Sequence, residues 1–247
     1  MTAAAQEHSI EAWLARAGAL EIGLLAAACG LLIGAVARAA SRSAPGAQED
    51  DMAKGSVPAG VAAQYEGRYE VARIRPERAA QIDAEIDRIL AARARYERVA
   101  AETGVPWHVI AVIHLLESNL SFAKHLHNGD PLTGRTVHVP ADRPAAPPRS
   151  GSFPYTWEES AADALSRFRS WRNWGVAGTL YQLEKYNGWG YQNRGVPSPY
   201  LWSYSDQYER GKYASDGVYD PNLVSRQPGA ASVLKRMEER RIISIPR

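Results

Sequence analysis

VPWHVIAVIHLLESNLSF, residues 105–122, carries apolar side chains around nearly the whole circumference of the helix that it predicts. Pro106 suits the first turn of that helix, because a residue in this position needs no amide proton. A helix that is apolar all round is typical of the core of a domain. The stretch therefore predicts a central buried helix, and this helix ends in the pair Glu117 and Ser118.

Other helical patterns lie on both sides of this stretch. A long helix is predicted from Pro76 to Gly104, with isoleucines on one face and a glycine at its end. Thr156 and Glu159 form a capping-box pattern that opens another helix. The last predicted helices cover residues 176–185 and 227–241. The fold class is therefore predicted to be mainly α.

Two stretches lack a helical period. Residues 119–156 are rich in proline and glycine, which predicts a long loop or a small hairpin subdomain, with one hairpin within residues 124–140. Residues 186–221 are rich in Tyr, Trp, Gly and Pro and are predicted to be irregular. Loops as long as the first are usually functional.

The N-terminal quarter has a different composition. Residues 17–37, AGALEIGLLAAACGLLIGAVA, are long enough as a helix to span about 30 Å, although Glu21 and many small residues make the span weak. The alternative is a buried or interfacial helix of a soluble protein. We expect a tail at 1–16, a membrane-type helix at 17–37, a flexible linker at 38–65 and one domain at 66–247.

Composition excludes several classes of protein. One cysteine in 247 residues excludes a disulfide scaffold and a cysteine-rich zinc site. A net charge of +2 argues against a strongly basic nucleic-acid binder, so no nucleic-acid partner is expected. The 7 Trp and 12 Tyr, against 3 Phe, are aromatic residues that suit a wet cleft as well as a core.

Glu117 is the first candidate for chemistry. A carboxylate at the end of an apolar helix costs free energy unless it is paired or protonated. Burial raises the pKa of such a group, so that it keeps its proton near neutral pH and can act as a general acid. The alternative is a structural glutamate that binds the backbone or an arginine.

The order of the motifs resembles the goose-type lysozyme and soluble lytic transglycosylase families. Those families place a Glu-Ser pair at the end of an apolar helix, and Glu117 and Ser118 match it. They also carry an Ala-Tyr-Asn-like motif that lines the sugar cleft, which Tyr186 and Asn187 match within LEKYNGWGY. The Gly-Leu-Met-Gln-like motif that transglycosylases place after the catalytic helix is absent from this sequence.

A further resemblance concerns the loop HLHNGDPLT, residues 125–133, which is similar to loops of prophage endolysin-like proteins. Asp130 and Thr136 show the Asp-x5-Thr spacing of phage-type lysozymes, where both residues face the catalytic glutamate across the cleft. The resemblance implies that Asp130, with Thr136, positions water or stabilises charge on the sugar. The alternative is that Asn-Gly-Asp-Pro is only a turn sequence.

Histidines near this loop raise the question of a metal. His125, His127 and His138 lie close to Asp130 in the sequence, but no His-x3-His pattern accompanies them. We therefore expect no metal and no other cofactor. We expect these histidines, His127 among them, to border the cleft or to bond to Asp130 instead.

The aromatic residues of the C-terminal half are candidates for sugar binding. Rings such as those of Tyr200 and Trp202 can stack on the flat C–H faces of sugars. The alternative, expected for about half of these aromatic residues, is packing within a loop-rich subdomain. The resemblance thus gives a substrate-binding set with the following members: Ser118, His127, Tyr186, Asn187, Tyr200 and Trp202.

These features predict a lysozyme-like peptidoglycan hydrolase of the muramidase type, a glycosidase that cleaves β-1,4 bonds. Glu117, Asp130 and Thr136 are its expected catalytic residues. The alternatives are a lytic transglycosylase, a chitinase- or chitosanase-like enzyme, and a non-catalytic glycan-binding wall protein. Residues 17–37 resemble the signal-arrest-release segments of endolysins, so the enzyme is expected to be tethered to or released from the inner membrane, with its catalytic domain in the periplasm. We also expect it to be a monomer.

Overall fold

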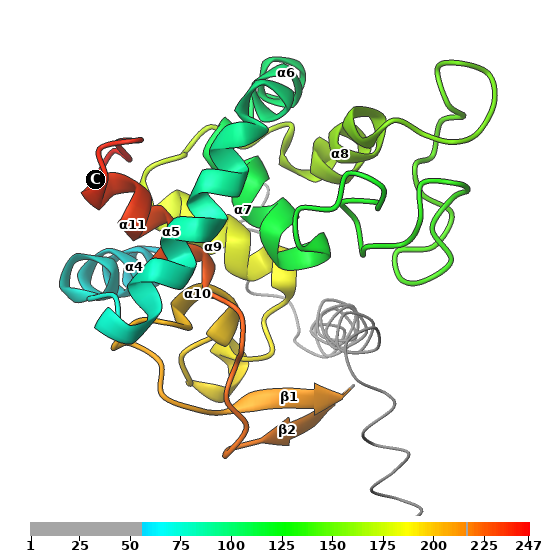
Figure 1. Cartoon of the computed structure of the whole chain (residues 1–247). Helices are drawn as coiled ribbons and strands as arrows, with labels where there is room; N and C mark the ends of the chain where they lie inside the picture. The colour runs from blue at the N-terminus through cyan, green and yellow to red at the C-terminus, as the bar shows by residue number, and fades with distance from the viewer. Residues whose placement is uncertain (1–55, 216) are drawn as a thin grey trace, which may run out of the picture.

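The computed structural model describes residues 56–215 and 217–247, and this part of the chain is mainly helical, with eight α-helices and little strand (Figure 1). The mainly α prediction is therefore confirmed. The expected tail, the membrane-type helix and most of the expected linker lie outside the described residues.

The first described helix, α4 (Ala59–Val71), corrects the predicted end of the linker at residue 65. Tyr65 and Tyr69 are 3% and 1% exposed, and α4 packs against α9 (Val176–Asn187). These two tyrosines are spaced by four residues, so they lie on one face and bury it against the domain. The folded domain therefore begins before residue 65.

The predicted long helix from Pro76 to Gly104 is two helices, α5 (Pro76–Ala91) and α6 (Arg93–Thr103), which meet at Ala92. The break follows from their different packing partners. α5 packs against α11 (Ala230–Glu239), whereas α6 packs against α7 (Trp107–Ser118) and α8 (Trp157–Leu165). Gly104 ends α6 in the left-handed conformation, with φ of 74°, as a C-terminal glycine does.

Helix α7 is the buried central helix that its sequence predicts. Every side chain from Val109 to Ser118 is buried, and α6 and α11 both pack against the helix (Figure 1). Asn119 ends it with φ of 52°, in the left-handed conformation that asparagine tolerates. The core of the domain is therefore built around α7.

The segment between α7 and α8 follows an extended path along one side of the molecule (Figure 1). The hairpin expected within 124–140 is reduced to a single antiparallel bridge between Lys124 and Pro131. Proline cannot donate to a ladder, which limits the pairing. The described hairpin lies instead within the stretch predicted to be irregular, where β1 (Lys212–Ser215) pairs antiparallel with β2 (Val218–Asp220).

The remaining helices pack around these elements. The capping box of α8 is confirmed, because the Thr156 hydroxyl accepts from the Glu159 amide while the Glu159 carboxylate accepts from the Thr156 amide. Gly229 precedes α11 at a close approach, since a Cβ there would lie 2.3 Å from the Leu201 carbonyl oxygen. Three short helices complete the domain: η2 (Ser166–Phe168), η3 (Gln192–Arg194) and α10 (Pro199–Trp202).

Within the described ranges, no single helix is long and apolar enough to cross a membrane. The pair α6 and α7 satisfies the length and composition requirement together, but the two helices are bent by 114°.

Two truncations test where the folded domain begins. A chain that starts at residue 56 should keep the thermal stability of the domain, because α4 is complete in it. A chain that starts at residue 66 loses the buried Tyr65 ring and should be less stable by at least about 3 kcal/mol. Thermal and urea unfolding followed by circular dichroism measure the difference. Equal stability of the two truncated chains would contradict the placement of α4.

Candidate active site

Glu117 lies in the last turn of α7, and its side chain is enclosed. The residue is 6% exposed, and the apolar helix that carries it is buried on every side. The Tyr200 hydroxyl donates a hydrogen bond to Glu117 Oε1 at 3.2 Å. The predicted burial of the carboxyl group is therefore confirmed, and the position offers a polar partner for it.

Tyr200 reaches Glu117 from a distant part of the sequence. It belongs to α10, which packs against α9 and α11, and these helices hold it beside the end of α7. The sequence predicted a substrate-binding role for Tyr200. The structure makes it a direct partner of the candidate acid, 83 residues away along the chain.

Ser118, the other member of the Glu-Ser pair, is turned back to its own helix. Its hydroxyl donates to the His114 carbonyl at 3.2 Å, and the residue is 5% exposed. Such i−4 bonds are common for serine inside helices. The structure therefore gives Ser118 a local partner and no exposed surface for a sugar.

Asp130 organises its own loop. Its Oδ2 accepts hydrogen bonds from the backbone amides of Val137 and His138 and from the Asn128 side chain, at 2.9 to 3.1 Å. Its Oδ1 lies 2.6 Å from His138 Nδ1. Both carboxylate oxygens are thus occupied by neighbours within ten residues. Burial alone would raise the pKa of Asp130, but the bonds from His138 and Val137 outweigh it and hold the pKa below its usual value.

Thr136 stabilises the same loop. Its hydroxyl donates to the Pro140 carbonyl and accepts from the Arg143 amide, and the Thr136 backbone amide donates to the Arg143 carbonyl. These bonds close a turn over residues 136–143. The Asp-x5-Thr spacing therefore marks two residues that fold one loop, and the structure does not leave their polar atoms open toward a substrate.

His127 fixes this segment to helix α8. Its Nε2 lies 2.7 Å from Asp163 Oδ2, which also accepts from Arg143 Nε at 2.9 Å. His127 is 4% exposed, and burial lowers its pKa to about 4, so the ring is neutral near pH 7. The expected place at the border of a cleft is therefore not what the structure gives. Sequence reasoning missed Asp163, an acidic residue that stands between two alanines of α8.

Tyr186 and Asn187 are both enclosed at the end of α9. The Tyr186 hydroxyl donates to the Leu126 carbonyl at 2.8 Å and so attaches the long segment to α9. Asn187 is 0% exposed, and its amide atoms have no hydrogen-bond partner among the described residues. Neither side chain presents surface to a glycan in this structure.

Trp202 does not support the predicted sugar stacking. It is 2% exposed and lies in the core, with the Arg68 guanidinium 5.7 Å from the ring centroid. A sugar needs an open ring face to stack. Trp202 points inward because the short, apolar helix α10 packs against both α9 and α11.

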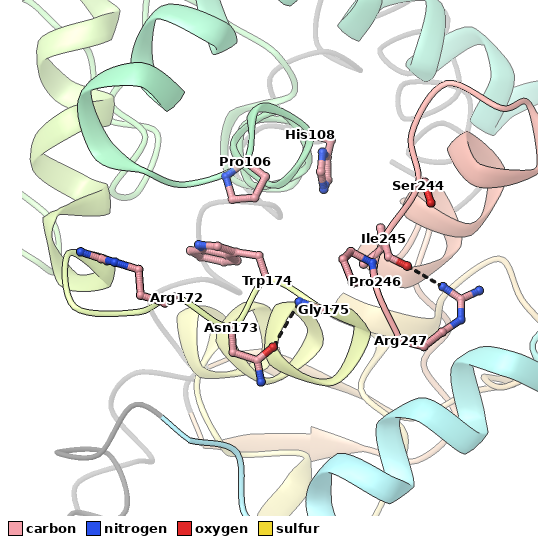
Figure 2. Close-up of a pocket in the computed structure, with 10 residues that line it drawn as sticks. All are labelled: Pro106, His108, Arg172, Asn173, Trp174, Gly175, Ser244, Ile245, Pro246 and Arg247. Atoms are coloured by element: carbon pink, nitrogen blue, oxygen red, sulfur yellow. Dashed lines mark hydrogen bonds between the residues drawn. The ribbon is translucent and has the colours of Figure 1, made fainter.

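A cavity of about 410 Å³ lies at the opposite end of α7 (Figure 2). His108 and Glu117 are nine residues apart, which is about 13 Å along a helix axis. Burial lowers the pKa of His108 to about 4, so its ring is neutral near pH 7. This cavity is therefore separate from the candidate acid. Its lining includes Pro106, His108, Trp174, Gly175, Ile245 and Pro246.

In the described part of the chain, no group of three or more His, Cys, Asp or Glu side chains is arranged to hold a metal ion. Comparison with known proteins finds no matching family model, no matching curated protein and no matching solved structure.

Replacing Asp130 tests its role in the loop. Asp130→Asn puts an amide where the loop supplies donors, so the free energy of unfolding in urea should fall by about 1 to 3 kcal/mol at pH 7. Asp142→Asn is the matched control, because Asp142 is an exposed residue of the same loop. An Asp130→Asn variant as stable as the control would contradict the role.

The pH dependence of Asp130 has a defined sign. Its pKa is lowered in the folded state, so its contribution is present above about pH 4 and is lost as the pH falls through the folded value. The stability difference between the parent chain and Asp130→Asn should therefore shrink below about pH 4. Urea unfolding at a series of pH values measures it, and a difference that grows at low pH would contradict the assignment.

Proposed function

We propose that the domain is a lysozyme-like glycosidase that cleaves β-1,4 bonds of peptidoglycan, with Glu117 as the general acid. The observation that carries the proposal is an acidic side chain, 6% exposed, at the end of a buried helix, with the Tyr200 hydroxyl donating to it. A protonated carboxyl group in such surroundings can donate its proton to a leaving oxygen. Order of motifs and the mainly helical fold support the same conclusion.

In the proposed reaction Glu117 first donates a proton and later accepts one. Glu117 gives its proton to the glycosidic oxygen as the bond between that oxygen and the sugar C1 breaks. Water then adds to C1 and returns a proton to the Glu117 carboxylate, which leaves a free reducing end. Tyr200 holds the carboxyl group in place through Oε1. Because Glu117 is enclosed, glycan binding must move side chains at the end of α7.

A lytic transglycosylase is the second candidate, and the Asp130 contacts favour it. Both Asp130 oxygens are occupied by its own loop, so a second carboxylate is not free there to activate water. The 6-hydroxyl group of the sugar would then attack C1 and pass its proton to Glu117, forming a 1,6-anhydro end. The two candidates differ in product mass by one water.

The proposed partner is peptidoglycan, and the proposed location is the periplasm. This assignment rests on the apolar segment 17–37 and on the resemblance of the domain, with the enzyme either tethered to the inner membrane or released from it.

Glu117→Gln tests the acid. The amide has the same shape but cannot donate the proton, so the rate of clearing a peptidoglycan suspension should fall at least about a hundredfold. Glu97→Gln is the matched control, because it removes an exposed carboxyl group whose ion partner is Arg93. Clearing by Glu117→Gln at the parent rate would show that Glu117 is not the acid.

The Tyr200→Phe variant tests whether Tyr200 positions the Glu117 carboxyl group. The ring stays, but the bond to Oε1 is lost, so kcat should fall about tenfold with little change in KM. A change confined to KM would instead indicate that Tyr200 acts through substrate binding.

The identity of the product ends decides between the two reactions. Mass spectrometry of fragments released by the parent enzyme should show free reducing ends if water attacks. Anhydro ends would contradict hydrolysis and establish the second candidate.

A further inference from the structure

Glu184 is a buried acid that the proposed reaction does not use. It lies in α9, is 2% exposed, and faces α4 across a helix–helix contact. The Tyr65 hydroxyl of α4 donates to Glu184 Oε2 at 3.4 Å. A void of about 20 Å³ adjoins both residues, which is room for about one water molecule. An ionised carboxylate in this position would lose most of its hydration.

The groups that face Glu184 come from two other elements. From α4 these are the Tyr65 hydroxyl and, as the cation, Arg68; from the turn before α10 it is the Ser198 hydroxyl. Tyr181 of α9 acts on Tyr65. Burial raises the pKa of Glu184 to about 8, and the nearby Ser198 and Tyr65 hydroxyls and Arg68 only partly oppose it. The acid is therefore mostly protonated near pH 7.

The C-terminal half of α4 is attached to the domain through Tyr69, which binds an ionised acid. The Tyr69 hydroxyl donates to Glu238 Oε2 at 2.8 Å, and Lys235 Nζ donates to the Tyr69 carbonyl at 3.0 Å. Burial would raise the pKa of Glu238, but bonds from the Ile245 amide, Tyr69 and Arg247 outweigh it and lower the pKa. One tyrosine of α4 thus meets a neutral acid and the other meets an ionised one.

We propose that the N-terminal half of α4 is a pH-controlled latch: it stays docked on α9 while Glu184 carries its proton, and it opens when Glu184 ionises. The inference goes beyond the proposed glycosidase function and does not depend on it. It rests on the enclosure of Glu184 under Tyr65 and on the second, ionic anchor at Tyr69.

The direction of the effect follows from the two states of the acid. In the docked state Glu184 titrates near pH 8, and when α4 opens it meets water and titrates near its ordinary value of 4.5. Opening therefore releases a proton between these two values. Docking is strongest below about pH 4.5, and opening becomes favoured by up to tenfold for each pH unit until about pH 8.

Hydrogen exchange of the full-length chain tests the latch. Rates for amides of residues 61–66 are measured from pH 5 to pH 9 in the parent chain and in Glu184→Gln, which cannot ionise. The ratio of parent to variant rates cancels the chemical pH dependence of exchange. It should rise at least about tenfold between pH 5 and pH 8 and then level off.

Two further variants make the result specific. Glu238→Gln is the matched control, because Glu238 also accepts from a tyrosine of α4 but is ionised throughout this range; the ratio of parent to Glu238→Gln rates should not change with pH. Tyr65→Phe removes a hydroxyl that lowers the pKa of docked Glu184, so the pH at which the rise in exchange levels off should move higher. This variant gives an independent test if Glu184→Gln does not fold.

Three outcomes would overturn the latch. One is a parent-to-Glu184→Gln ratio that is constant from pH 5 to pH 9. Another is a rise of equal size across every helix, which would indicate global unfolding. The last is an unchanged pH profile in Tyr65→Phe. None of these measurements uses a wall substrate, so failure of the latch is distinguishable from failure of the proposed glycosidase.

Discussion

The enclosure of a carboxyl group at the end of a buried helix is the constraint on which the rest of this structure depends. Helix α7 is apolar on all sides, so other helices must cover it, and α6 and α11 do so. That cover also encloses Glu117, and a buried acid without partners costs free energy. The Tyr200 hydroxyl of α10 supplies a hydrogen bond to this carboxyl group. The packing that buries α7 therefore also forms the candidate site.

The long segment after α7 is held by polar bonds rather than by regular structure. Asp130 accepts hydrogen bonds from backbone amides of its own loop, while His127 and Arg143 both bind the Asp163 carboxylate of α8. Tyr186 of α9 fixes the backbone at Leu126. The polar residues of this segment therefore stabilise its fold, and Glu117 is the carboxyl group that we propose as the acid.

The sequence was most informative where local chemistry is decisive. The apolar pattern of α7, its terminal carboxyl group, the glycine that ends α6 and the capping box of α8 were all predictable. The break at Ala92 was not, because it depends on which helices cover α5 and α6. The sequence left the roles of Asp130 and Trp202 open and did not single out Glu184, for a related reason: a turn sequence, an aromatic ring or an acid in a helix does not reveal what will pack against it. The start of α4 was obscured by its small, weakly apolar residues.

The most direct test of the central claim is a crystal structure of the Glu117→Gln variant with a peptidoglycan oligosaccharide bound. The account predicts that a glycosidic oxygen lies within about 3 Å of the side chain at position 117, with the Tyr200 hydroxyl on the other side of that group. An oligosaccharide bound elsewhere on the domain, with position 117 still enclosed, would contradict it.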